Sequence, residues 1–183
     1  MAKTTVYQLK ITLQDSKPPI WRRVLVKATT TLFELHEIIQ ITMGWDNYHL
    51  HQFIIDNEYY ATPHPDDWHT VLDERKYSLK KLDFVEKSKF VYEYDFGDGW
   101  GHTILVEKIL PYETGKQYPR CIKGKRACPP EDVGGVWGYA EFLEAIKDPE
   151  HESYEMYVDW IGDDFDAEEF DLEEVNAILK EYF

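Results

Sequence analysis

Strand-like and helical patterns occupy different parts of this chain, and that segregation is the strongest constraint on its fold. Alternating apolar residues predict strands over 4–14, 20–28, 49–55, 58–61, 89–94 and 102–110. Helical periodicity occurs at 31–44 and then mainly in the last 45 residues. Strands that do not alternate with helices favour an antiparallel over a parallel sheet. We therefore expect an α+β fold. A single domain over 1–183 would have a mainly antiparallel sheet from the N-terminal part, with C-terminal helices packed on it.

Short motifs predict where several elements begin and end. Thr31 to Glu34 form a capping box that opens the first helix, and Gly44 is placed to end it. Asp56-Asn57 predicts a hairpin turn, and Asp171 is expected to cap the last helix. The expected core residues of the second strand and the last helix are Trp21, Val24, Val26, Val175, Ile178, Leu179 and Tyr182.

Residues 111–137 are rich in proline and glycine and lack a clear periodicity. We expect a long ordered loop there, and such loops often carry function. Four aromatic residues near glycines are expected to pack in the core: Phe96, Trp100, Trp137 and Tyr139.

The charge of the chain is concentrated near its C-terminus. The formal net charge is −15, and residues 140–183 carry 16 acidic residues and two lysines. That quarter should repel nucleic acid and most simply forms solvated helical faces. With no apolar stretch of membrane-spanning length and no leader-like N-terminus, we expect a soluble cytoplasmic protein without a membrane partner.

Histidines provide one candidate metal site. His49 and His51 are two residues apart on a predicted strand, so their side chains should share a face. His102 begins another predicted strand, after Asp95 and Asp98. These histidines with a carboxylate could hold Zn²⁺ and leave a coordination position open. Hydrogen-bonded histidines without a metal are the alternative.

The two cysteines and one basic segment are further candidates. Cys121 and Cys128 are too far apart in sequence for a typical zinc pair and are expected to be packing residues. The span 115–130 contains no acid and carries Lys116, Arg120, Lys123, Lys125 and Arg126. This segment could bind phosphate or nucleic acid. We expect instead that Arg120 or Arg126 pairs with a carboxylate of the C-terminal quarter, within the molecule or across a homodimer.

Several strings taken together are similar to a known family. They are PPIWRRVLV at 18–26, GWD and HLH within 44–51, YDFGDGWGHTILVE at 94–107, ACPPEDVGGVWGY at 127–139, and the closing WIGDDFDAEEFDLEEVNAIL. The chain resembles the Ri-plasmid ORF-3-like family of plasmid and mobile-element proteins. The resemblance implies a free-standing α+β domain with no established activity. The family pattern has a cysteine after PPED, where this chain has Val133, so it implies no cysteine-based metal site here.

Some relatives carry the label of a resolvase-like (TnpR-type) transposon passenger, which the residues do not support. A serine resolvase needs a nucleophilic serine beside arginines, and none of Ser16, Ser78, Ser88 or Ser153 has such neighbours in sequence. Our leading hypothesis is a non-enzymatic binding or interaction domain, associated with mobile elements. The alternatives are a zinc-dependent enzyme using the histidines, and a nucleic-acid accessory protein using the basic segment.

Overall fold

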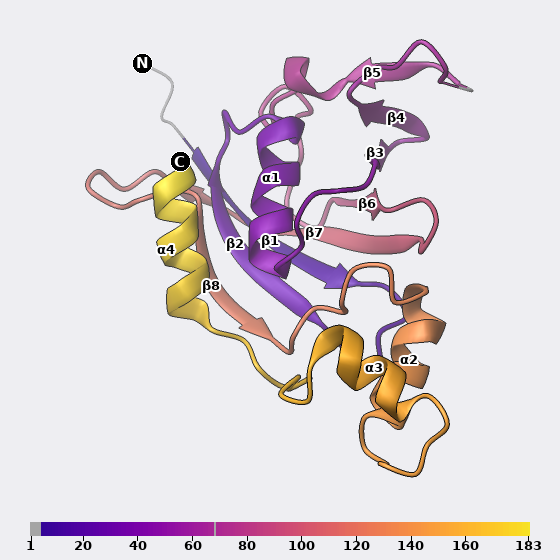
Figure 1. The fold of residues 1–183 in the computed structure, drawn as a ribbon. Coiled ribbons are helices and arrows are strands. Elements are labelled where there is room, and N and C mark those ends of the chain that lie inside the picture. Colours follow the sequence, from indigo (N-terminus) through magenta and orange to yellow (C-terminus); the bar gives the residue numbers. More distant parts are fainter. Residues whose placement is uncertain (1–4, 68) are drawn as a thin grey trace.

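The computed structural model describes residues 5–67 and 69–183. Its centre is an eight-stranded sheet in the order β5-β4-β3-β6-β7-β1-β2-β8, in which every pair is antiparallel except β4 with β5 (Figure 1). The strands are β1 Thr5–Leu13, β2 Trp21–Lys27, β3 His51–Ile55, β4 Glu58–Ala61, β5 Val71–Asp73, β6 Lys89–Tyr94, β7 Trp100–Pro111 and β8 Arg120–Lys125. The helices are α1 Leu32–Met43, α2 Gly135–Ala145, α3 Tyr154–Ile161 and α4 Leu172–Tyr182, with one short 3₁₀ turn at Glu74–Lys76. The expected α+β fold is confirmed.

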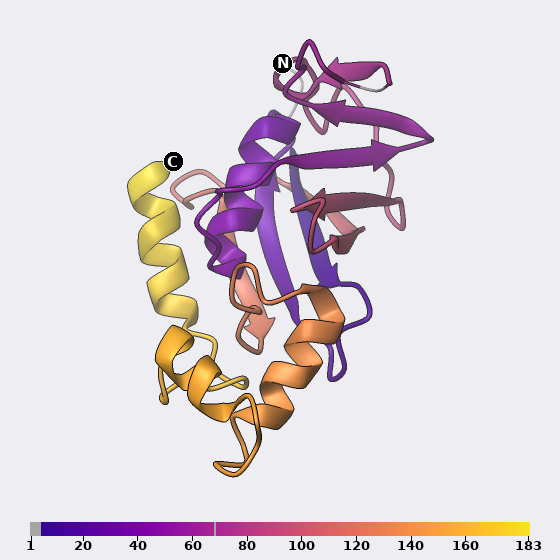
Figure 2. The same ribbon diagram turned by 45° about the vertical axis from the view of Figure 1, so that its right-hand side comes forward.

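Helix α1 covers one face of the sheet and forms the centre of the core. Thr31 and Glu34 make the reciprocal capping-box bonds, and Gly44 ends the helix with a φ of 96°. Buried residues alternate along the central strands, so one sheet face packs against α1 while the other carries partly exposed side chains. Helices α1 and α4 lie on the same side of the sheet (Figure 2). We call the opposite side, which no helix of the described chain covers, the open face.

Helix α4 docks against the edge strand β8 and against α1. The side chain of Asn176 both accepts from the backbone N–H of Cys121 and donates to its carbonyl, at 2.9 and 2.8 Å. This pair satisfies backbone groups that an edge strand would otherwise leave unpaired. Asp171 caps the helix by accepting from the N–H groups of Glu173 and Glu174, as expected.

Two strands were missed by periodicity. β8 lies inside the segment expected to be a loop, and its register with β2 shifts between Arg23 and Val24, which breaks the alternation. β5 has only three residues and pairs in parallel with β4. Such short or bulged strands carry too few alternating positions to be recognised.

Some expected core residues lie at the surface. Trp21 is on the open face, and the buried neighbour on the core side is Arg22, whose Nε donates to the Thr42 carbonyl at 2.6 Å. In α4, Leu179 is fully buried and Tyr182 is 71% exposed, because the helix end extends past the sheet. Phe96 and Trp137 are also exposed, whereas Trp100 and Tyr139 are buried as expected. No helix in the described ranges has both the length and the apolar character needed to cross a membrane.

Candidate metal site

Three segments that are distant in sequence meet where β3 begins and β6 ends. They are residues 45–50 before β3, 95–99 between β6 and β7, and 129–135 before α2. Each belongs to one of the strings on which the family resemblance rests. We refer to this meeting point as the three-loop site.

Hydrogen bonds between side chains and backbone groups hold the three segments together. Trp45 Nε1 donates to the Pro129 carbonyl at 3.0 Å, and the Asp46 N–H donates to Glu131 Oε1 at 3.0 Å. The Gly134 N–H donates to Asp98 Oδ2 at 3.0 Å. At Gly135 a Cβ would lie 2.5 Å from the Asp98 carbonyl oxygen, so only glycine permits this close approach.

His49 lies at the centre of the site and faces three carboxylates. Its Nε2 is 3.2 Å from Asp132 Oδ1, 3.7 Å from Glu131 Oε2 and 3.8 Å from Asp95 Oδ2. One donor atom from each of His49, Asp95 and Asp132 falls in a group whose members are all within 4.8 Å of one another. Donors bound tetrahedrally to an ion at 2.0–2.2 Å are about 3.3–3.6 Å apart, so a small closure would bring this group to coordination distance.

The facing atoms are buried without hydrogen-bond partners in the described structure. His49 Nε2 and Glu131 Oε2 are both inaccessible to solvent and make no hydrogen bond. Asp95 is 91% buried, since its side chain is 9% exposed, and its other oxygen accepts from the Gly97 N–H at 2.9 Å. Asp132 is 67% exposed and forms the open side of the site. Buried polar atoms without partners are costly, so these two atoms single out this part of the site.

Tyr94 fixes the position of Glu131 by a hydrogen bond to its carboxylate. Its hydroxyl donates to Glu131 Oε1 at 3.0 Å and accepts from the Tyr48 N–H at 3.1 Å. Burial, together with the adjacent Glu131 carboxylate, raises the pKa of the Tyr94 hydroxyl, which therefore stays protonated as a donor. One oxygen of Glu131 is thus committed to holding the loops, while the other faces His49.

The three predicted histidines do not form one ligand group in residues 5–67 and 69–183. His51 Nε2 bonds to the buried Glu74 carboxylate at 2.9 Å, and its ring stacks on His36 at 3.4 Å. His102 is fully buried against Trp45 and Tyr92. The same-face argument does not apply to His49 and His51 because β3 begins at His51, so strand alternation does not extend to His49.

The other sequence candidates lie elsewhere. Cys121 is fully buried and Cys128 partly so, both are free thiols, and burial raises the pKa of each. Arg126 pairs with Glu168 of the C-terminal quarter at 2.8 Å, which confirms the expected charge pairing for this arginine. Arg120, Lys123 and Lys125 are exposed on β8, and none has an ion pair within the described part of the chain.

Acid should destabilise the protein through two buried histidines. Burial, assisted by the charge of His51, lowers the pKa of His36 to about 3, and burial lowers that of His102 to about 4. In the unfolded chain both rings take up a proton near pH 6.5. Below that pH the unfolded state binds more protons, so each histidine removes about 1.4 kcal/mol of stability per pH unit until its folded pKa is reached.

His102→Leu isolates one of these contributions. Neither ring nitrogen of His102 makes a hydrogen bond of normal geometry in the described structure, although backbone groups of Tyr92 and Trp100 lie close to the ring, so the substitution loses at most weak polar contacts. Urea unfolding between pH 6 and 4.5 should show a pH slope that is smaller by about 1.4 kcal/mol per unit than in the parent. Val85→Ala, at a residue that is 64% exposed and does not titrate, should leave the slope unchanged. Parallel slopes for the parent and His102→Leu would contradict a neutral buried His102.

Comparison with known proteins places the chain in a family. A family model described as plasmid pRiA4b ORF-3-like protein matches residues 5–174. An uncharacterized protein of Sinorhizobium fredii, y4hQ, is 38% identical over 177 residues, which are 96% of this chain and 91% of that protein. The crystal structure of a protein of unknown function from Methanosarcina mazei Go1, MM3350, has a TM-score of 0.87 and 42% identity, over 94% of this chain and 98% of that one. This chain therefore belongs to the family of plasmid pRiA4b ORF-3-like proteins.

Proposed function

We propose that this protein is a binding domain for one divalent transition-metal ion, held at the three-loop site by His49, Asp95 and Asp132. The observation that carries the proposal is the group of three donor atoms within 4.8 Å of one another. The buried, unpartnered Nε2 of His49 supports it, because a cation would bind this atom and the carboxylates at once.

The donor set favours a borderline metal. One imidazole suits Zn²⁺, Fe²⁺ and other transition ions, while two carboxylates also suit Mn²⁺. Mg²⁺ and Ca²⁺ prefer oxygen donors alone and should bind more weakly. Glu131 would add negative charge beside the ion and orient the site through Tyr94 and Asp46.

The exposure of Asp132 leaves one side of the site open to solvent. Three protein ligands with a free position are the arrangement in which a bound metal keeps a water molecule. Such a site binds an exchangeable ligand, whereas a purely structural zinc site is closed by four protein ligands. Direct contact of His49 with the three carboxylates, without a metal, is the alternative explanation of the same distances.

Equilibrium dialysis of natively purified protein distinguishes these explanations. We expect one Zn²⁺ or Mn²⁺ per chain after dialysis, a higher melting temperature with the ion than with chelator, and weaker effects of Mg²⁺ and Ca²⁺. A ratio near zero for all four ions, with unchanged melting temperatures, would favour direct contact of His49 with the carboxylates and contradict the proposal.

A further inference from the structure

The open face carries a row of basic residues that cross the sheet in register. Lys10 on β1 pairs with Arg23 on β2 and with Leu105 on β7, Arg23 pairs with Lys123 on β8, and Leu105 pairs with Lys89 on β6. Directly paired residues project from the same face of a sheet. Neighbouring strands are about 4.8 Å apart, so four cations fall within roughly 19 Å.

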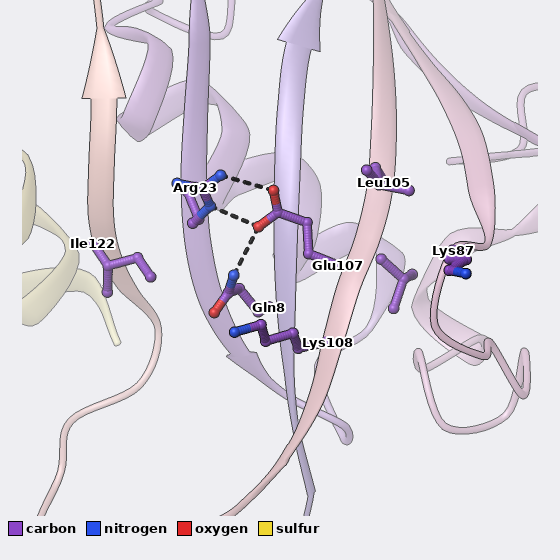
Figure 3. A pocket seen from close by; sticks show the side chains of 8 residues that line it. Gln8, Arg23, Lys87, Leu105, Glu107, Lys108 and Ile122 are labelled. Atoms are coloured by element: carbon purple, nitrogen blue, oxygen red, sulfur yellow. Dashed lines mark hydrogen bonds and ion pairs between the residues drawn. The ribbon is translucent and has the colours of Figure 1, made fainter.

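Like charges directly opposite one another on paired strands are destabilising. In the basic row only Arg23 is neutralised within the described structure, by Glu107 at 2.6 and 2.8 Å, and Gln8 also donates to that carboxylate (Figure 3). Lys10, Lys89 and Lys123 have no ion pair among residues 5–67 and 69–183. Within the described structure, three of the four cations of the basic row therefore have no carboxylate paired with them.

A shallow groove of about 580 Å³ borders this row, and Arg23 and Leu105 are the members of the row that line it (Figure 3). Arg23, Leu105 and Glu107 form part of its wall, and Ile122 lies across from them. Lys87 and Lys108 add two further exposed cations to its lining. The groove is thus lined by three cations, with the carboxylate of Glu107 beside Arg23 and with the apolar residues Leu105 and Ile122 among them.

A second row runs beside the basic row on the same face. It is uncharged except at its β8 end, where Lys125 pairs with Trp21, and we call it the neutral row. It is two residues further along each strand, a separation of about 6.8 Å. Trp21 is the aromatic member of this row that lies nearest the basic row. Lys10 Nζ and Arg23 Cζ are each 5.1 Å from the centroid of its ring. The other uncharged members, in register across the sheet, are Thr12, Thr103, Val91, Ile54 and Tyr59.

The acidic C-terminal quarter does not cover this face. Helix α4, with its acidic first turn, lies on the α1 side of the sheet (Figures 1 and 2). At physiological ionic strength charges separated by more than about 8 Å of solvent are largely screened. The repulsion expected from net charge alone therefore acts on the other side of the molecule.

We propose that the open face binds single-stranded nucleic acid, with phosphates along the basic row and bases against the neutral row. Single strands combine closely spaced phosphates with flat apolar bases, and proteins bind them with cationic grooves and aromatic platforms. Acidic protein surfaces, including the C-terminal quarter of a second copy, offer carboxylates but no repeating flat groups.

Fluorescence anisotropy with a labelled 20-nucleotide single strand, DNA and RNA in parallel, tests this proposal. The buffer contains chelator, so the outcome is independent of the metal site. We expect binding at low salt, with a log–log salt slope of about −0.7 for each phosphate contacted. Changing Lys10, Lys89 and Lys123 together to glutamine should weaken binding at least about 10-fold and flatten the slope, since three contacts are lost. Trp21→Ala should weaken it about 5-fold or more through lost stacking.

A charge-matched control places glutamine at three exposed lysines that lie outside the strands of the sheet, Lys116, Lys147 and Lys180. It should bind like the parent, and circular dichroism should show all variants folded. Absence of binding at low salt, or equal weakening by the control, would overturn the proposal. So would self-association that the basic-row variant abolishes in a protein that does not bind the single strands, because the face would then bind a second copy.

Discussion

Replacing His49 or Asp95 by asparagine should weaken binding of Zn²⁺ or Mn²⁺ by about 100-fold or more. Each substitution removes one of three donor atoms in the three-loop site. Changes to residues that merely orient a ligand typically lower metal affinity 10- to 100-fold, so loss of a ligand itself should reach at least the upper end of that range. A competitive titration against a chromophoric chelator measures the affinities directly.

Two further variants make this result specific. Glu131→Gln should weaken metal binding by about 10-fold, because it leaves the three ligands in place and removes charge beside them. His64→Asn is the matched control, since His64 lies 3.6 Å from Asp66 in an exposed pair outside the donor group. Equal affinities for the parent, His49→Asn and His64→Asn would show that any bound metal lies elsewhere.

Leu179→Ala should lower the free energy of unfolding by about 2–5 kcal/mol. Leu179 is fully buried, with 0% accessible surface. It belongs to the hydrophobic core cluster at the place where α4 packs on β8. The substitution leaves a cavity and loosens the helix whose Asn176 satisfies the backbone of the edge strand. Urea denaturation followed by circular dichroism gives the difference.

Tyr182→Ala provides the comparison on the same helix. Its side chain is 71% exposed, so its removal should change the unfolding free energy by less than about 0.5 kcal/mol. If both variants are as stable as the parent, α4 is not docked as the structure has it. If both are equally destabilised, the contact surface of α4 has been assigned to the wrong side.

The sequence predicted those elements whose determinants are local. The capping box at Thr31, the left-handed Gly44 and the Asp56-Asn57 turn each depend on neighbouring residues, and all three were found. Trp21 was wrongly predicted to face the core, because a large apolar side chain next to an arginine is normally the buried one of the two. The structure buries Arg22 instead, and that side chain bonds the carbonyls of Thr42, Trp21 and Lys125.

The candidate site could be predicted only in part. His49 and Asp95 were singled out from sequence, but Asp132 lies 83 positions after His49 and was not. Its position depends on tertiary contacts such as those of Trp45 with Pro129 and of Asp98 with Gly134. His51 was included because strand alternation was extended to the whole HLH string, and the actual strand begins only at His51. His102 was included because it follows Asp95 and Asp98 in sequence, but the structure buries it against Trp45 and Tyr92.

The most direct test of the metal proposal is a crystal structure of the Mn²⁺- or Zn²⁺-loaded protein with anomalous scattering data. We predict one strong anomalous peak within about 2.0–2.2 Å of His49 Nε2 and of one oxygen each from Asp95 and Asp132. A well-ordered site with no peak between these residues, at metal concentrations that saturate the protein in solution, would contradict it.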